Sequence, residues 1–254
     1  MRDAESDAPV CGDTYAEAFM NEEGLRILEA FKDETSPNAS NVARHRIIDD
    51  ILRRELQSDH GLLVVIIGAG FDSRAYRLEG GAWVELDEPQ VISYKDERLP
   101  ASTCSNELRR IPIDFSVDSL EEKLDAFSNR SPVAVVIEGV FMYLEEDAIR
   151  QTLQTLRGLF PTHTLVCDLM NKEFFEEYGK TLHEKLTGLG ASFKFTADDP
   201  VEVFAQSGYI LAEKTSIVKK AVDFGLLQIP KVILQTALSG LVNGNAIHVF
   251  ETAG

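Results

Sequence analysis

Short apolar runs alternate with amphipathic segments through the middle of the chain. The runs that predict buried strands are residues 62–67, 82–87 (the weakest), 109–115, 133–138 and 164–169. The segments between them with apolar side chains at helical spacing are residues 88–99, 116–127 and 145–160. Strands that alternate with amphipathic helices are typical of βαβ units. We therefore predict an α/β domain with a mostly parallel sheet and helices on both of its faces.

The two ends of the chain depart from this alternation. Residues 14–31 have helical periodicity, residues 34–40 (ETSPNAS) have the composition of a loop, and apolar side chains in residues 41–56 predict a helix before the first strand. Near the other end, residues 208–218 and 245–252 are strand-like. We expect these two strands to close the sheet, one of them in the antiparallel direction.

Composition narrows the classes of partner. The chain has 254 residues, a hydrophobic fraction of 44% and a formal net charge of −17. These values suit one large soluble domain, and the negative charge disfavours nucleic acid and anionic membranes. No apolar run approaches the ~20 residues that span a bilayer. The acidic start lacks the apolar run of a secretion signal, so we expect a cytoplasmic protein.

The cysteines give no sign of a metal centre. Cys11, Cys104 and Cys167 are far apart and show no Cys-x-x-Cys or Cys/His spacing. That pattern predicts neither a zinc site nor a disulfide framework. We expect no metal.

A glycine turn ends the first apolar run. Gly68-Ala69-Gly70 follows residues 62–67, and in open α/β sheets ligands bind beyond such strand ends. Glycine lets a ligand approach the bare backbone. The next strand ends at Asp87, seventeen positions after Gly70 (87 − 70), near the ~20-residue offset at which an acid reaches a ribose. The pattern predicts a nucleoside site, and an ordinary tight turn is the alternative.

The turn departs from the dinucleotide pattern. A G-x-G-x-x-G fingerprint would have a third glycine where this chain has Ser73, and Asp72 brings a negative charge towards the expected position of a pyrophosphate. Both features disfavour NAD or FAD and favour a cofactor without phosphate, such as S-adenosylmethionine. A nicotinamide-dependent oxidoreductase remains the weaker alternative.

Four segments resemble, in order and spacing, motifs of the leucine carboxyl methyltransferase family: VVIIGAGFDSRAYRL, VELDEPQVISYKDERL, IPIDF and VVIEGVFMYLEEDAI. The resemblance covers about residues 40–170, and Ser73 replaces the threonine that is usual in this family. It implies the Rossmann-like fold of class I S-adenosylmethionine-dependent O-methyltransferases. That fold has a seven-stranded, mostly parallel sheet, here with an N-terminal helical extension.

The resemblance also implies roles at the methionyl end of the cofactor. Arg44 would hold the cofactor's carboxylate, and Glu138 would meet its amino group. Gly68 and Gly70 would pass beneath the methionyl part. The alternative for Arg44 is an ion pair with Asp49 or Asp50 on a solvated helix face.

At the nucleoside end, the resemblance implies that Asp87 takes the ribose hydroxyls. Asp114 and Phe115 would frame the adenine, with Asp114 near its amino group. The alternative for Asp114 is a cap on the next helix. We expect Arg74 and Arg77 on a helix surface or at the sheet edge, and we assign no role to any of the five histidines.

The acceptor is not specified by any motif. A carboxylate, with a pKa of ~4, needs no base, whereas a phenol, with a pKa of ~10, does. The matched segments offer no histidine or lysine placed as an obvious base, so a carboxylate on a small molecule is favoured and the catalytic residues stay unassigned. A non-catalytic S-adenosylmethionine-binding protein is the alternative function.

We predict an N-terminal helical extension or cap at residues 1–58 and a methyltransferase domain at residues 59–254. Residues 222–244 are apolar, and Pro230 is placed to open a helix there. Residues 219–244 are therefore a candidate insertion on the acceptor side, or a face that pairs with a second subunit.

Overall fold

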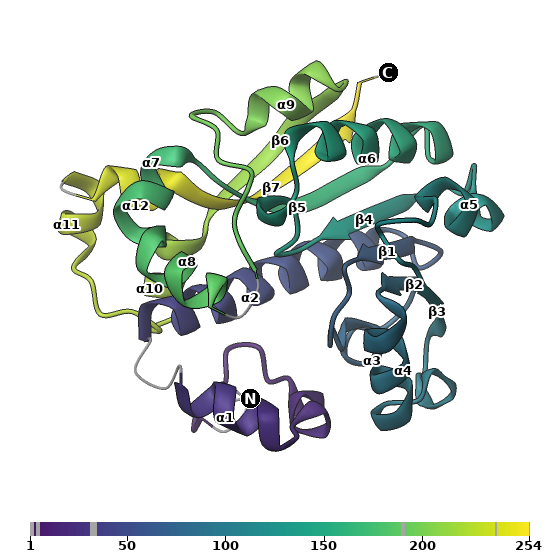
Figure 1. Ribbon diagram of the computed structural model, residues 1–254, viewed down its shortest axis with the longest axis horizontal. Coiled ribbons are helices and arrows are strands. Elements are labelled where there is room, and N and C mark those ends of the chain that lie inside the picture. The colour runs from purple at the N-terminus through teal and green to yellow at the C-terminus, as the bar shows by residue number, and fades with distance from the viewer. Residues whose placement is uncertain (1–2, 4–5, 31–34, 189–190, 237, 254) are drawn as a thin grey trace.

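The computed structural model describes residues 3, 6–30, 35–188, 191–236 and 238–253 (Figure 1). Seven strands form one sheet in the order β3-β2-β1-β4-β5-β7-β6. Their bounds are β1 Leu63–Ile67, β2 Ala82–Asp87, β3 Glu107–Pro112, β4 Val133–Ile137, β5 Thr164–Met170, β6 Tyr209–Ser216 and β7 Asn245–Thr252. Strands β1 to β5 pair in parallel, and β7 runs antiparallel to both of its neighbours. The predicted α/β sheet with one antiparallel strand is confirmed.

The strand boundaries agree with the apolar runs except at β3. The sequence predicted residues 109–115, whereas β3 is Glu107–Pro112. This strand lies at the edge of the sheet, where its side chains are exposed or half-buried, so no continuous apolar run marks its start.

Helix α2 (Thr35–Ser58) lies along one face of the sheet (Figure 1). Its buried side chains include Ile48 and Leu52, which join the core beneath Val64 and Ile66 of β1. The prediction of a loop at residues 34–40 was wrong over Thr35–Ser40, which are helical. Pro37 falls in the first turn, where the backbone N–H groups have no helical partner and proline is tolerated.

The other helices cover both faces. On the face of α2 lie α3 (Arg74–Arg77) and α10 (Ile217–Asp223), and on the opposite face lie α5 (Leu120–Leu124), α6 (Glu146–Leu159) and α9 (Val201–Gln206). Helix α4 (Pro89–Arg98) contacts β2 and β3. The faces separate because side chains alternate along a strand: Val64 packs with α2, and Val65 packs with α6.

Short helices gather where β5 ends and β7 begins (Figure 1). They are α7 (Lys172–Phe174), the π-helix η5 (Phe175–Gly179), α8 (Lys180–Thr187), α11 (Lys231–Thr236) and α12 (Ser239–Gly244). The predicted helix after Pro230 is present as α11. The remaining short elements are η1 (Thr14–Phe19), α1 (Glu22–Ala30), η2 (Ala101–Thr103), η3 (Asp125–Phe127) and η4 (Phe141–Tyr143). Among the described residues, no helix is long and apolar enough to cross a membrane.

Candidate active site

The two glycines after β1 meet different needs. Both have positive φ, +71° at Gly68 and +46° at Gly70, a backbone conformation that favours glycine. A Cβ on Gly68 would lie 2.5 Å from Cγ2 of Val140, so this glycine lets the turn pack against the loop after β4. A Cβ on Gly70 would meet nothing within 4 Å. Gly70 therefore presents bare backbone to open space.

Asp87, at the end of β2, lies against this turn. Its Oδ2 accepts a hydrogen bond from the N–H of Gly70 at 2.6 Å, and its Oδ1 accepts one from the N–H of Glu88 at 2.7 Å. A carboxylate has about four acceptor positions, so each oxygen retains capacity for a further donor. The structure thus brings together the acid and the turn that the sequence placed seventeen residues apart.

Asp114 and Phe115 follow β3 and are more open. Asp114 Oδ1 accepts from the N–H of Ser116 at 2.9 Å, and the hydrogen bonds from Ser116 lower the pKa of Asp114. The alternative role of a helix cap is wrong, because Ser119 caps α5. Phe115 is 46% exposed and borders a cavity of about 500 Å³ whose other walls include Ile67 and Val140. Asp114 is not among the residues that line this cavity.

Arg44 connects α2 with the ends of β4 and β5. Its Nε donates to Oε1 of Glu138 at 2.9 Å, and its Nη1 donates to Oδ2 of Asp168 at 3.1 Å. Asp168 is almost fully buried, and its Oδ1 accepts from the N–H of Gly139 at 2.6 Å. The alternative ion pairs of Arg44 with Asp49 or Asp50 are therefore replaced by pairs across the strand ends.

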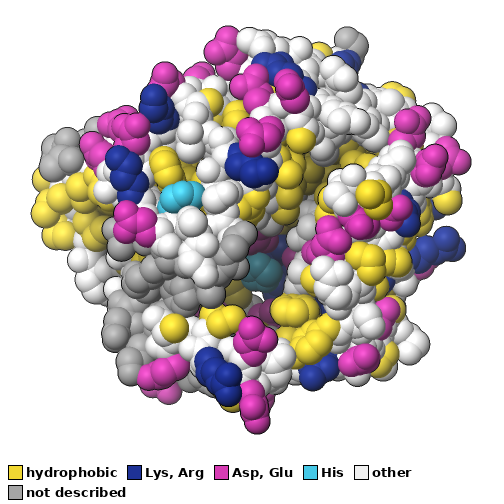
Figure 2. Space-filling view, viewed as in Figure 1, with side chains coloured by type: hydrophobic (Ala, Val, Ile, Leu, Met, Phe, Trp, Pro, Cys, Tyr) yellow, Lys and Arg dark blue, Asp and Glu magenta, His cyan; other side chains and the backbone are white. Residues whose placement is uncertain are grey.

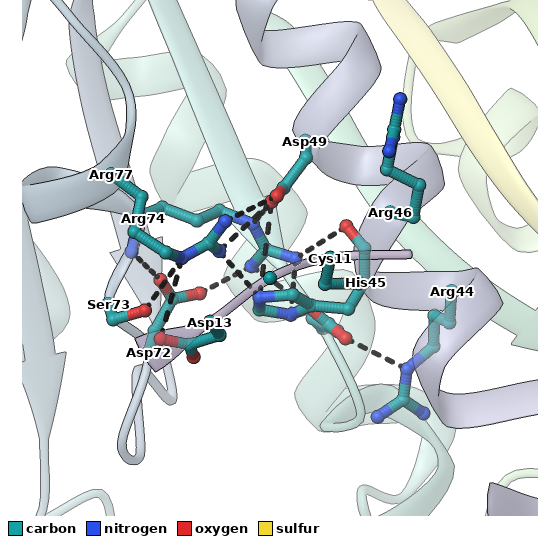
Figure 3. A network of polar contacts seen from close by, with 12 residues as sticks. Cys11, Asp13, Arg44, His45, Arg46, Asp49, Asp72, Ser73, Arg74 and Arg77 are labelled. Carbon is teal, nitrogen blue, oxygen red and sulfur yellow. Dashed lines mark hydrogen bonds and ion pairs between the residues drawn. The ribbon is translucent and has the colours of Figure 1, made fainter. Parts of the chain in front are cut away.

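Arg74 lies at the centre of a charged cluster (Figure 3). Its Nε donates to Oδ1 of Asp49 at 2.7 Å, and its Nη1 pairs with Asp72 and, at 2.8 Å, with Oε2 of Glu138. The side chain is fully buried, so the prediction of a surface position was wrong. The physical reason is that acids from three separate segments converge on one guanidinium, which a single sequence segment does not reveal.

His45 and Arg77 complete this cluster. Nδ1 of His45 lies 2.7 Å from Nη2 of Arg74, and its Nε2 lies 2.7 Å from Nη2 of Arg77. Arg77 also donates to Asp49 Oδ2 at 2.6 Å. His45 received no role from the sequence, yet it lies inside the charged cluster. The sequence feature that could have identified His45 was its position directly after Arg44.

The charges in the cluster keep its acids ionised. Burial raises the pKa of Asp49, but Arg74 and Arg77 outweigh it and lower the pKa to about 2. Burial likewise raises the pKa of Glu138, and Arg74 and Arg44 then hold it well below its usual value. Both acids are therefore anionic at neutral pH.

The contacts in the charged cluster bear on the charge of Asp72 and on the possibility of a metal site. The sequence predicted that the charge of Asp72 disfavours a pyrophosphate. Asp72 pairs with Arg74, so its charge is balanced and this prediction is weakened. Ligand atoms of His45, Asp72 and Glu138 lie within 4.8 Å of one another, a spacing that suits a metal ion. All three already contact Arg74, however, and this guanidinium supplies the positive charge.

The N-terminal segment covers the charged cluster. A cavity of about 350 Å³ is bordered by Asp3, Cys11 and Asp13 on one side, and by α2 and Glu138 on the other. The Asp3 carboxylate accepts from the N–H groups of residues 10, 11 and 12 at 2.8, 2.8 and 3.1 Å and so fixes this loop. Burial raises the pKa of Cys11 to about 12, so its thiol is protonated and unsuited to act as a nucleophile.

Sequence reasoning missed Gly139 and Asp168. Gly139 has φ +69°, and a Cβ there would lie 3.3 Å from Nη2 of Arg44, so glycine allows the guanidinium to approach the backbone. Asp168 stands in an otherwise apolar strand, and a buried acid without a partner is costly. That isolated acid was the signal that could have identified it.

Comparison with known proteins gives both sequence relatives and structural neighbours. A presumed S-adenosyl-L-methionine-dependent methyltransferase of Mycolicibacterium smegmatis is 34% identical over 158 residues, which are 55% of this chain and 52% of that protein. A similarly named protein of Mycolicibacterium paratuberculosis is 33% identical over 176 residues, 62% of this chain and 58% of that protein. The chain spans little more than half the length of these curated relatives.

Two solved structures show the fold. Magnesium protoporphyrin IX methyltransferase of Synechocystis PCC 6803, with bound SAH, has a TM-score of 0.53 at 14% identity, over 84% of this chain and 86% of that one. Geranyl diphosphate methyltransferase in complex with SAM has a TM-score of 0.55 at 10% identity, over 82% of this chain and 85% of that one. A family model described as leucine carboxyl methyltransferase matches residues 1–157, more than half of the chain. This chain has the class I methyltransferase fold and belongs to the leucine carboxyl methyltransferase family.

Proposed function

We propose that this protein is an S-adenosylmethionine-dependent O-methyltransferase whose acceptor is the carboxylate of a small molecule. One observation carries the proposal: Arg44 and Glu138 are paired at 2.9 Å and border the same cavity at the strand ends. The methionyl end of the cofactor has an ammonium and a carboxylate. An acid beside an arginine matches both groups.

The other proposed contacts to the cofactor come from residues at the carboxyl ends of β1, β2 and β3. Gly68 and Gly70 lie beneath the methionyl part, and the open space at Gly70 supports this position. Asp87 receives the ribose hydroxyls on the acceptor positions that its backbone hydrogen bonds leave. Asp114 and Phe115 border the adenine, and the half-exposed ring of Phe115 offers an apolar surface to a base.

Methyl transfer depends mainly on the alignment of the cofactor's methyl group with the acceptor oxygen. When bound, the cofactor supplies an activated methyl group, which the acceptor oxygen takes as the carbon–sulfur bond breaks. Arg44 and Glu138 fix the methionyl end, and Asp87 fixes the ribose, so the methyl group is held in one orientation. No proton is moved when the acceptor is a carboxylate.

The contacts of His45 support a carboxylate acceptor. His45 is the histidine that borders the cavity of the charged cluster, and both of its ring nitrogens contact guanidinium groups. A general base needs a nitrogen that is open to the acceptor proton. His45 is occupied in positioning Arg74 and Arg77, and a carboxylate acceptor has no such proton.

Calorimetric titration and a methyl-transfer assay test the function. We expect S-adenosylmethionine and its demethylated product to bind without added metal, and NADH not to bind. Binding of NADH without S-adenosylmethionine would favour the oxidoreductase and refute the proposal. A panel of carboxylic acids and phenols then distinguishes the possible acceptors. Turnover of phenols alone would refute the proposal of a carboxylate acceptor. If neither class is methylated, the alternative of a non-catalytic S-adenosylmethionine-binding protein is favoured.

A further inference from the structure

A third cavity, of about 310 Å³, lies at the end of β5 and the start of β7. Its walls are mostly apolar and include Met142, Met170, Phe174, Phe193, Leu227 and Leu241. The hollow near the centre of the face shown in Figure 2 has a histidine side chain at its floor, whereas no histidine is among the described residues that line the cavity of about 310 Å³. Unlike the cavity of the charged cluster, this one has a surface that favours a hydrophobic ligand.

The two cavities share a wall on α2. Asn41 and Arg44, one helical turn apart, line both the apolar cavity and the cavity of the charged cluster. A molecule in the apolar cavity therefore meets a ligand of the charged cluster at these two side chains. Group transfer between two ligands requires such a meeting point.

The charges that border the apolar cavity are already balanced. Arg44 and Asp168 are its charged lining residues among those described, and they pair with each other at 3.1 Å. A second ionised group in the ligand would lose its hydration without gaining a partner. At the shared wall, the side-chain amide of Asn41 can donate a hydrogen bond to one carboxylate, so the ligand can have one polar end there and must otherwise be apolar.

The volume and the side chains limit the size and shape. A cavity of roughly 150 Å³ accommodates benzene, so about 310 Å³ leaves room for a body of about two rings. Methionine side chains adapt to flat apolar groups, and sulfur contacts aromatic edges favourably. Met142 and Met170, together with the aromatic rings of Phe174 and Phe193, supply walls of this kind.

We infer that the apolar cavity is the acceptor site and takes a hydrophobic monocarboxylic acid of about two fused rings, with its carboxylate at the wall of Asn41 and Arg44. This inference rests on the proposed function. Five of the six apolar residues named above follow residue 157, beyond the part that matches the family. Most of the side chains that would select the acceptor thus lie in the part of the chain that the family model does not cover.

Binding of naphthalene acids in the presence of S-adenosylhomocysteine tests this inference on the unmodified protein. We expect 2-naphthoate to bind at least ~tenfold more tightly than naphthalene-2,6-dicarboxylate, because the second carboxylate has no partner. Equal binding of the two acids, or no binding of naphthoate while S-adenosylhomocysteine binds, would overturn the inference and leave the proposed cofactor site intact. Failure of S-adenosylhomocysteine itself to bind would instead refute the proposed function.

Two variants locate the site. Leu227→Gln and Phe174→Ala should each weaken 2-naphthoate binding by ~tenfold or more, the range for a changed contact in a hydrophobic pocket, with S-adenosylhomocysteine affinity unchanged within about twofold. Val232→Gln is the control, since Val232 belongs to the same segment as Leu227 but is 70% exposed. Unchanged naphthoate affinity in both folded cavity variants would place the acid elsewhere.

Discussion

The cavity of the charged cluster and the apolar cavity, which meet at Asn41 and Arg44, are built in opposite ways. The charged cluster holds Arg44, Arg74, Asp49 and Glu138 in direct ion pairs, of which the pair between Arg74 and Asp49 is fully buried. The apolar cavity is bordered by methionine, leucine and phenylalanine side chains. In the first, each group depends on one named partner at one distance, whereas in the second the total volume matters more than any single contact.

This difference determines how each half tolerates change. A buried ion pair contributes little net stability while it is complete, but the loss of one partner leaves a charge without water or counterion. An apolar wall tolerates substitutions that keep its volume. Single substitutions in the charged cluster (the charged half of the site) should therefore change stability and cofactor affinity. Substitutions in the apolar cavity (the apolar half) should change which acceptor is bound.

The largest effect is expected for Asp49→Asn. Asp49 is fully buried and pairs with both Arg74 and Arg77, so its loss leaves two guanidinium groups without their shared counterion. We expect the free energy of unfolding in urea to fall by about 3–5 kcal/mol. The matched control is Asp50→Asn, because the neighbouring Asp50 forms exposed pairs with Arg46 and Arg53 and should cost less than about 1 kcal/mol. Equal losses in the two variants would contradict the account.

The second-largest effect is expected at low pH, where protonation of the acids in the charged cluster lowers the free energy of unfolding. The pKa of Asp49 is lowered from 3.8 to about 2, so its contribution is complete above pH ~4 and is lost as the pH falls towards 2. Such a shift corresponds to about 2 kcal/mol, and Glu138 shifts in the same direction. Urea unfolding measured from pH 5 to pH 2.5 should show this decline. A free energy of unfolding that stays level over this range would show that the cluster does not depend on ionised acids.

Asp87→Ala tests the nucleoside end of the proposed cofactor site. It removes the proposed ribose contacts, each a charge-assisted hydrogen bond of ~1.5–3 kcal/mol, so S-adenosylmethionine should bind at least tenfold more weakly. Glu79→Ala, an exposed acid near the same strand, should bind within about twofold of the unmodified protein. Normal cofactor binding by the Asp87 variant would remove this acid from the proposed site.

The smallest effect is expected for Asp168→Asn, which lies where the two halves meet. Asp168 supports Arg44 and the Gly139 turn, and the variant weakens the charged bond to Arg44 while keeping a similar shape. We expect cofactor affinity to fall by about fivefold, since one charged hydrogen bond becomes a neutral one. The exposed Asp198→Asn is the control. If cofactor affinity is unchanged while folding is intact, Arg44 does not need Asp168.

The same division explains what the sequence could predict. The strands, their order along the chain and the positions of Gly70, Asp87 and Glu138 follow from apolar runs and motif spacing. The buried position of Arg74 could not be predicted, because its partners Asp49 and Glu138 are distant in the chain and meet only in the folded sheet. The apolar cavity was hidden only in part: residues 219–244, singled out from the sequence, contribute Leu227, Ile229 and Leu241, whereas its other walls come from separate segments with no motif of their own.

The central claim is that Arg44 and Glu138 hold the charged methionyl end of the cofactor, and one calorimetric comparison tests it directly. S-adenosylhomocysteine carries the amino and carboxylate groups, whereas 5′-methylthioadenosine keeps the nucleoside and lacks both. We predict that the unmodified protein binds S-adenosylhomocysteine at least ~tenfold more tightly, and that Glu138→Gln reduces this ratio. Equal affinity for the two compounds in the unmodified protein would contradict the account.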